Sequence, residues 1–279
     1  MKRAIDLYAP RQIEIFNIVK PVIGMIHLKP LPGTPKWEND LEDIIDYALG
    51  DFEALIAGGV DGIILENFMD RPFKQRIRDP ETIAAFSIIA WEIRKRATVP
   101  VGINLLRNSG IEAMAIACIV GADFIRVNAY SEPLWSSEGL LQPIARDIQS
   151  LKSKLNCKVK IFADVNCKHS KPIMDLIEAS IEAHRRGSAD ALIVSGSRTG
   201  EPVNPIDLYL VRKYTSIPIV LGSGARPGNL GMYWKLVDAF IVGTYFKRHG
   251  NVFEPVDTDR VKRFMEKVKW FRKKYGYST

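Results

Sequence analysis

Eight short β-branched segments of two alternating types constrain the fold of this chain more than any other feature of its sequence. One type opens with a small or apolar residue and Asp, followed by an apolar run, and occurs at 60–64, 122–125, 189–193 and 237–241. The other type lies before and between these, at 20–24, 99–103, 158–162 and 217–221. Apolar residues at helical spacing fill most of the gaps. The alternation predicts eight βα units that close into a (β/α)8 TIM barrel.

The length of 279 residues suits one such barrel, so we expect 1–279 to form a single TIM-barrel domain. Residues 1–20 are expected to be an N-terminal extension. In it, Ile15, Ile18 and Val19 have the spacing of a short helix that could close one end of the barrel. Residues 261–275 are expected to form a C-terminal helix with one apolar face and one solvated face of Lys and Arg.

The formal net charge of +7 has its excess in this C-terminal helix. No recognised nucleic-acid-binding motif accompanies it, which favours a solvated face over a nucleic-acid site. An interface between subunits of a homo-oligomer is a further alternative. The charge is compatible with a small phosphorylated or other anionic ligand. No apolar run reaches the length of a membrane span, and no secretory h-region follows the first residues, so we expect a cytoplasmic protein.

The cysteines give no sign of a disulfide framework. Cys118, Cys157 and Cys167 are odd in number, and none belongs to a CxxC pair. Neither a disulfide framework nor a structural zinc site is therefore favoured, and a reducing compartment is consistent with this usage.

Polar side chains are predicted to gather at the C-terminal ends of the strands, where TIM barrels carry out their chemistry. Side chains alternate along a strand, so aligning the segments shows which late positions share the inward face. Seven polar residues fall there: His27, Glu66, Asn104, Arg126, Asn128, Asp164 and Ser195. A barrel interior normally holds branched apolar side chains, so this density of polar groups predicts a functional site.

Two carboxylates and a histidine of this ring are the candidate catalytic groups. Asp164 with Glu66 or His27 would exchange protons at carbon or oxygen, as in an isomerase, a lyase or a glycosyl-type hydrolase. Structural alternatives are a hydrogen-bonded His27 and an ion network in which both carboxylates pair with Arg126. A metal held by these three groups has no diagnostic spacing, and the sequence identifies no cofactor. The remaining groups would bind and orient the substrate: Asn104, Arg126 and Asn128.

Glycines follow the last two strands, at the place where many TIM barrels hold phosphate. The segments are Gly222-Ser223-Gly224 and Gly243-Thr244. Glycine lets backbone amides approach an anion closely, so these segments predict a phosphate site. Ser195 and Thr199, from the loop after the sixth strand, would assist. Turn-making glycines that bind nothing are the alternative.

The loop after the fifth strand places Lys168 and His169 beside Asp164. Both are candidate substrate-binding residues. Lys168 could bind an anion or form a Schiff base, with an ordinary solvated lysine as the alternative.

Long loops on the predicted catalytic face follow the first, second, fourth and sixth strands, at 28–39, 68–79, 129–139 and 196–204. The connections on the opposite face are short, as expected when only one rim binds a ligand. Tyr130 and Trp135 could cover the mouth as a mobile lid or lie on an ordinary surface loop. His249 is expected to be peripheral.

Five segments of the chain resemble the BtpA family: His27–Gly33, Asp61–Asn67, Gly102–Asn108, Phe124–Asn128 and Asp164–His169. The resemblance extends over nearly the whole chain, in order. It implies a TIM barrel grouped with phosphate-binding barrels, and a link to photosystem I biogenesis in photosynthetic organisms.

Two functions are therefore considered. The first is an enzyme that acts on a small phosphorylated metabolite, such as a sugar or nucleotide derivative. The second is a non-catalytic assembly or stability factor of the photosystem I biogenesis type, which would use the barrel as a scaffold. Exposed apolar residues such as Tyr233 and Trp234 would then matter.

Overall fold

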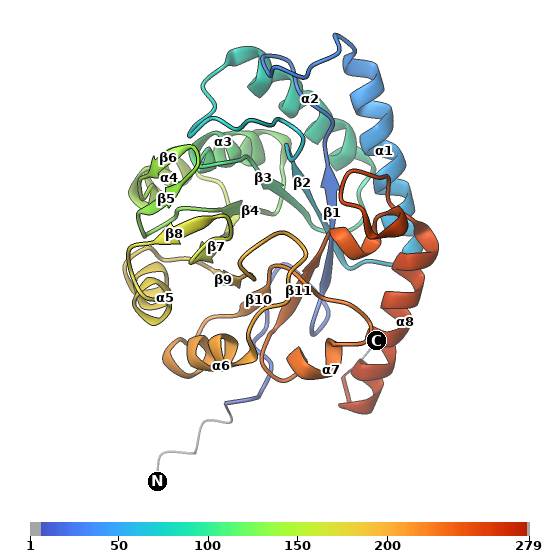
Figure 1. The fold of residues 1–279 in the computed structure, drawn as a ribbon, viewed down its shortest axis with the longest axis vertical. Helices are drawn as coiled ribbons and strands as arrows, with labels where there is room; N and C mark the ends of the chain where they lie inside the picture. The colour runs from blue at the N-terminus through green and yellow to red at the C-terminus, as the bar shows by residue number, and fades with distance from the viewer. Residues whose placement is uncertain (1–6, 278–279) are drawn as a thin grey trace.

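The computed structural model of the chain describes residues 7–277 and contains the predicted barrel. Eight parallel strands close in the order β1, β2, β3, β4, β7, β9, β10, β11, with the helices outside them (Figure 1). The strands are β1 (Val22–His27), β2 (Gly62–Glu66), β3 (Val101–Asn104), β4 (Phe124–Val127), β7 (Lys160–Val165), β9 (Ala191–Val194), β10 (Ile219–Leu221) and β11 (Ala239–Val242). The (β/α)8 TIM barrel is confirmed.

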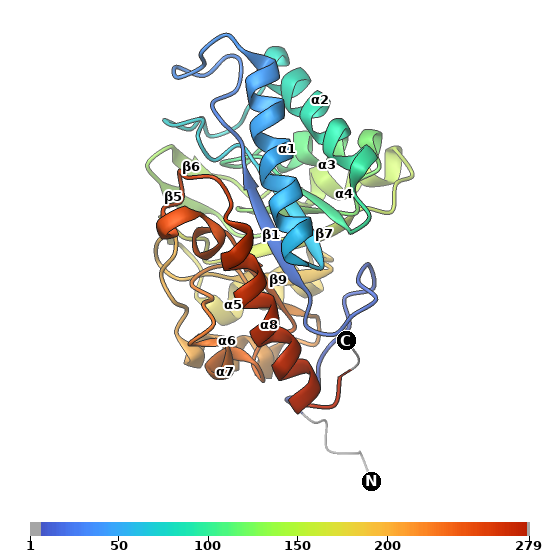
Figure 2. The same ribbon diagram turned by 90° about the vertical axis from the view of Figure 1, so that its right-hand side faces the viewer.

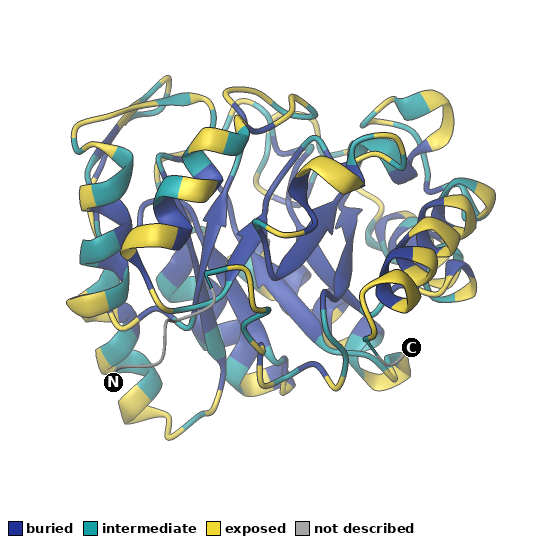
Figure 3. Cartoon of the chain, turned by 90° about the horizontal axis from the view of Figure 1, so that it is seen from below, coloured by how far each residue is buried: buried dark blue, intermediate teal, exposed yellow. Residues whose placement is uncertain are grey.

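The helices follow the strands around the barrel. They are α1 (Leu41–Gly58), α2 (Pro80–Arg96), α3 (Gly110–Val120), α4 (Ala145–Lys154), α5 (Leu176–Arg185), α6 (Pro205–Tyr214), the short α7 (Leu230–Tyr233) and α8 (Thr258–Lys274). The first and last helices, α1 and α8, pack against each other and complete the ring (Figure 2). The helices bury the faces that they turn to the strands and expose their outer faces, as the burial colours show (Figure 3).

The repeated Asp has a structural role at the start of the strands. In each repeat its carboxylate accepts a hydrogen bond from the first or second residue of the preceding barrel strand, and its own amide donates to the carbonyl of that residue. The carboxylate bonds join Asp61 to Val22, Asp123 to Val101, Asp190 to Ile161 and Asp238 to Ile219, at 2.8 or 2.9 Å. This pairing satisfies a strand-end amide that would otherwise lie unpaired at the edge of the core.

The N-terminal segment closes the end of the barrel away from the long loops. Ile13 and Phe16 are buried among inward-facing side chains such as Ile64 and Phe124, and Phe16 lies 6.3 Å from Phe124 between ring centroids. The predicted closure is thus present. The predicted helix is absent from residues 7–20, which form turns, because a short plug can bury two side chains without regular structure.

The long loops carry a small sheet that the sequence did not predict. It has the order β6 (Gly139–Leu141), β5 (Leu134–Ser136), β8 (Ser170–Pro172), and its strands pair antiparallel. The sheet joins the loop after β4 to the loop after β7. It therefore holds residues 170–172 against the loop after β4.

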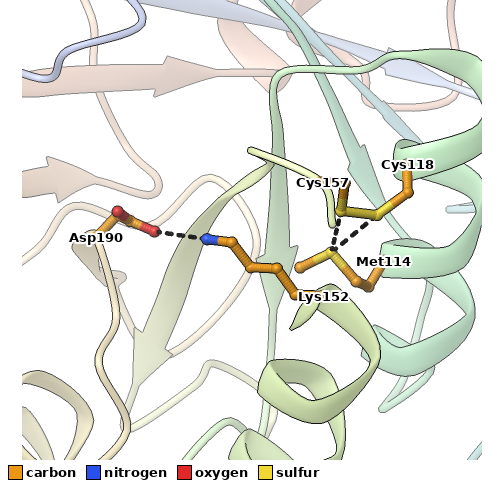
Figure 4. The surroundings of a disulfide bond; sticks show 5 residues. All are labelled: Met114, Cys118, Lys152, Cys157 and Asp190. Carbon is orange, nitrogen blue, oxygen red and sulfur yellow. Dashed lines mark hydrogen bonds and ion pairs between the residues drawn. A yellow bond between two sulfur atoms is a disulfide. The ribbon is translucent and has the colours of Figure 1, made fainter. Parts of the chain in front are cut away.

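A disulfide joins Cys118 of α3 to Cys157, which precedes β7, so the expectation of no disulfide is wrong (Figure 4). The sequence separation of 39 residues carries no local signal. Only the packing of α3 beside α4 brings the two sulfurs together, next to Met114 Sδ. Cys167 is a free, buried thiol.

Tyr233 and Trp234 are buried, which corrects the expectation that they are exposed. Trp234 stacks between Phe240 and Phe271, and Tyr233 Oη donates to the Val203 carbonyl at 2.8 Å. Both side chains belong to the core under α8. Among the described residues, no helix is long and apolar enough to cross a membrane.

Candidate functional site

A cavity of about 310 Å³ opens at the C-terminal ends of the strands, on the side of the long loops. Its wall combines polar and cationic side chains with glycine-rich backbone. Its lining residues include His27, Glu66, Phe68, Arg126, Lys168, Thr199, Gly222, Ser223, Gly224, Arg226, Gly243, Thr244, Tyr245, His249 and Arg260. Ten of the fifteen predicted site residues line it, and the others lie behind or beside it.

His27 and Glu66 are neighbours at the cavity wall because β1 and β2 pair in register there. His27 Nε2 lies 3.8 Å from Glu66 Oε1, and the side-chain amide of Asn104 donates to Glu66 Oε2 at 2.5 Å. The His27 ring stacks on Phe68 with 4.4 Å between centroids. Burial, with the nearby charge of Lys247, holds the pKa of His27 well below its ordinary value. The imidazole is therefore neutral at neutral pH.

Arg126 reaches the cavity from β4 and is held there by Asp164 of β7. Its Nε and Nη2 donate to the two Asp164 oxygens at 2.8 and 3.0 Å, and Asn128 donates to the same carboxylate at 2.7 Å. Arg126 Nη1 lies 3.8 Å from Glu66 Oε2. Burial opposes the charge on Arg126, but Asp164 and Glu66 outweigh it and raise the pKa of the guanidinium.

Asp164 does not line the cavity, and its side chain is fully buried. Its oxygens are occupied by Arg126 and Asn128. This geometry matches the ion-network alternative and does not place Asp164 at a reacting atom. Asn104 and Asn128 likewise lie behind the wall, where they donate hydrogen bonds to Glu66 and Asp164.

The loop after β7 separates its two candidate residues. Lys168 lines the cavity, whereas His169 is exposed and bonds Thr199, with 2.9 Å between His169 Nε2 and Thr199 Oγ1. His169 thus ties the loop after β7 to the loop after β9. Arg107 supports the same loop by donating to the Lys168 carbonyl at 3.2 Å.

The glycine-rich wall follows β10 and β11 as predicted. Gly224 has a φ of +74°, and a Cβ there would lie 2.4 Å from the Glu201 carbonyl oxygen, so only glycine fits. A Cβ on Gly243 would lie 3.3 Å from His27 Cε1, which shows how near this backbone comes to the imidazole.

Two predicted hydroxyl groups are not available at this wall. Ser223 Oγ accepts from the Gly196 amide at 2.9 Å and donates to the Glu201 carbonyl at 3.0 Å. It joins two loops and leaves only the Ser223 backbone for a ligand. Ser195 is absent from the cavity wall, and its buried Oγ has no partner within the described chain.

Two arginines line the cavity that were not predicted from the sequence, and one histidine lies there that was expected to be peripheral. Arg226 follows β10, and Arg260 comes from the first turn of α8. Arg260 is held by the Tyr245 carbonyl at 2.6 Å and by the Tyr245 ring at 4.6 Å. His249 lines the cavity and is not peripheral. Only the position of Arg226, directly after the glycines, could have signalled its place, because Arg260 arrives through tertiary packing.

The lid and metal hypotheses find little support in the geometry. Tyr130 is buried and donates to the Gly187 carbonyl, so it is a core residue, while Trp135 is exposed on β5. Within residues 7–277, no group of three or more His, Cys, Asp and Glu residues is placed to hold a metal ion.

Comparison with known proteins finds sequence relatives that match most of this chain. The profile of the BtpA family matches residues 18–270. The photosystem I biogenesis protein BtpA of Synechocystis is 40% identical, covering 91% of this chain and 89% of that protein. A Thermococcus kodakarensis protein is 41% identical, covering 91% and 97%. A Caenorhabditis elegans protein is 28% identical, covering 91% and 95%.

Solved structures share the fold at low sequence identity. Thiamine phosphate pyrophosphorylase from Pyrococcus furiosus has a TM-score of 0.54 and 17% identity, covering 90% of this chain and 96% of that one. Phosphoribosyl anthranilate isomerase from Thermus thermophilus has a TM-score of 0.53 and 14% identity, covering 90% of this chain and 100% of that one. At these identities the likeness shows the fold alone.

Proposed function

The chain belongs to the BtpA family, and we propose that it is an enzyme that binds a small phosphorylated metabolite in this cavity and transfers protons on it. The observation that carries the proposal is that one cavity joins a glycine-rich, arginine-bearing wall to the His27–Glu66 pair. A ligand of metabolite size could therefore occupy both at once. The reaction class is that of an isomerase, a lyase or a hydrolase.

The phosphate end is proposed at Gly222–Gly224, Gly243 and Thr244. Backbone amides of glycine-rich turns are suited to phosphate oxygens, and the loops after the seventh and eighth strands are the frequent phosphate site of this fold. Arg226 and Arg260 add positive charge at the same wall. The names of two enzymes that share the fold contain phosphorylated compounds, which supports the proposal by analogy.

The proton-transfer end is proposed at Glu66 and His27. Glu66 is held by Asn104 and lies near Arg126, so its carboxylate faces the cavity in a fixed position. Neutral His27 can both accept and donate a proton, and its Nδ1 has no hydrogen-bond partner among the described residues. Arg126, fixed by Asp164, would orient or stabilise an anionic group of the substrate.

Binding of phosphate compounds tests the first half of the proposal. Isothermal calorimetry with ribose 5-phosphate and inorganic phosphate should detect binding. Gly243→Asp adds a negative charge at the wall, so we expect it to weaken binding by about tenfold or more. Gly50→Asp is the control, because a side chain at Gly50 would meet nothing within 4 Å. No binding, or binding that Gly243→Asp leaves unchanged, would exclude the phosphate site.

Turnover tests the second half. Phosphorus NMR of a panel of sugar phosphates should reveal conversion by the wild-type protein. Glu66→Gln should abolish conversion while calorimetry still detects the ligand, because Gln keeps the hydrogen bond from Asn104 but cannot exchange a proton.

A non-catalytic assembly factor is the second candidate, favoured by the name of the Synechocystis relative. That function predicts that Glu66→Gln leaves complementation of a strain lacking the relative intact. Changes on an outer face would abolish it instead. The exposed Ile88 and Trp91 of α2 are the residues to change, since Tyr233 and Trp234 are buried.

A further inference from the structure

Lys168 is a lysine in an unusual position. It lines the cavity with Glu66, His27 and Arg126, and its side chain is half-buried. An ordinary surface lysine extends into solvent and samples many rotamers. Lys168 therefore differs from a lysine that extends freely into solvent.

The backbone on both sides of Lys168 is fixed. The Asn166 amide donates to Glu132 Oε1 at 2.5 Å, and the His169 amide donates to the Ser197 carbonyl at 3.2 Å. Asn166 and His169 both have positive φ values, of 48° and 59°. Asn166 lies at a bend, Lys168 and His169 form a turn, and Arg107 donates to the Lys168 carbonyl. Such support is what a side chain that must meet a ligand at a set position requires.

The amine of Lys168 has no partner of its own. Within residues 7–277, its Nζ makes no ion pair or hydrogen bond, whereas the buried Lys247 pairs with Asp51 and the buried Lys20 bonds the Val237 carbonyl. Burial and the neighbouring charge of Arg126 lower the pKa of Lys168. A lysine that is desolvated beside another cation has a larger fraction of neutral, nucleophilic amine.

We propose that Lys168 forms an imine with the substrate. Because an imine forms only with a carbonyl group, the substrates are phosphorylated aldehydes and ketones. The inference rests on the proposed function and extends it to a covalent intermediate. It requires that a carbonyl carbon reach Nζ while the phosphate lies at the glycine-rich wall. Both groups line the same cavity of about 310 Å³.

The step needs no oxidant or reductant. The neutral amine of Lys168 attacks the carbonyl carbon, a C–N bond forms as the second C–O bond of the carbonyl breaks, the oxygen takes up one proton, and the nitrogen releases one of its two protons to Glu66 or His27, which gives a neutral carbinolamine. The C–O bond then breaks, the oxygen receives a second proton and leaves as water, and nitrogen retains one hydrogen as an iminium ion. The net change is amine plus carbonyl plus one proton to iminium plus water. Glu66 or His27 would pass the protons at the oxygen.

Borohydride trapping tests this directly. The protein is incubated with dihydroxyacetone phosphate and sodium borohydride, which reduces an iminium ion to a stable secondary amine. Peptide mass spectrometry should then find the adduct on Lys168. Glycerol 3-phosphate, which has the same phosphate but no carbonyl group, should give none. Lys168→Arg should lose the adduct and still bind glycerol 3-phosphate by calorimetry, since it keeps the positive charge.

Lys171 provides the matched control, because it is an exposed lysine three residues away. Lys171→Arg should leave the trapping unchanged. Equal labelling of Lys168 and Lys171 would overturn the proposal, as would labelling that survives in Lys168→Arg.

Other outcomes separate this inference from the proposed function. Binding of glycerol 3-phosphate without any adduct would overturn the imine and leave the phosphate site standing. An adduct on Lys168 that excess inorganic phosphate does not suppress would support the imine and overturn the phosphate site. Absence of both binding and adduct would overturn both.

Discussion

Asp164 binds Arg126 through two hydrogen bonds, of 2.8 Å from Nε and 3.0 Å from Nη2, and both side chains are buried. Two strands of the barrel, β4 and β7, are therefore joined by a charge pair in which Arg126 lines the cavity and Asp164 lies behind it. The pair decides where the remaining guanidinium nitrogen lies, 3.8 Å from Glu66. Its removal should affect both stability and the site.

Asp164→Asn should destabilise the protein strongly. It leaves the buried charge of Arg126 without its main partner, a change that costs about 3 to 5 kcal/mol in other proteins. Asp79→Asn is the control, since Asp79 pairs with Lys74 at the surface and should lose less than about 1 kcal/mol. Urea unfolding gives both values. Equal losses of unfolding free energy in the two variants would show that the buried Asp164–Arg126 pair stabilises the protein no more than a surface pair does.

The repeated Asp residues allow a matched comparison. Asp123 and Asp238 make the same bond to a strand start, but Asp238 also pairs with Arg212 at 2.9 Å and is fully buried. Asp123→Asn should cost about 1 kcal/mol, the value of a hydrogen bond. Asp238→Asn should cost about 3 to 5 kcal/mol, because it leaves the buried charge of Arg212 without its carboxylate partner. Urea unfolding of both variants measures the difference, and similar losses would refute this assignment.

The barrel could be predicted because its signals are local. Alternation along a strand and the Asp at each second strand start are both readable within a few residues, and together they imply closure. The same alternation brought His27, Glu66 and Arg126 to one cavity.

Which polar residues of the predicted ring face the cavity, and which lie behind its wall, could not be predicted. Whether a carboxylate faces a ligand or a neighbouring cation depends on side chains far apart in sequence, as Asp164 and Arg126 show. For the same reason Arg260 was missed, since α8 brings it to the cavity from the end of the chain. The disulfide of Cys118 and Cys157 depends likewise on helix packing.

The disulfide should contribute measurably to stability. A crosslink over 39 residues removes chain entropy from the unfolded state that corresponds to about 4 kcal/mol. Reduction, or Cys118→Ser with Cys157→Ser, should therefore lower the melting temperature, and the double variant should no longer respond to reductant. Alkylation of the denatured, unreduced protein should modify only Cys167. Modification of all three cysteines without reductant would show that the bond is absent.

Glu132 should make stability depend on pH. It is buried in the loop after β4, with one oxygen bonded to the Asn166 amide, and burial raises its pKa to about 7 from an ordinary 4.5. The folded state then holds a proton that the unfolded state has released. Its contribution is full below about pH 4.5 and is lost as the pH rises to about 7, by on the order of 3 kcal/mol.

Glu132→Gln tests this dependence because it keeps the acceptor for Asn166 and cannot ionise. Asp70, with a pKa raised by burial to about 6, adds a fall of the same sign, so only the difference between variant and wild type is informative. Urea unfolding at about pH 5 and about pH 8 should show a smaller fall in Glu132→Gln than in the wild type. Glu53→Gln, at an exposed position of α1, should fall as the wild type does. An identical fall in all three proteins would mean that Glu132 is already ionised in the folded state at low pH.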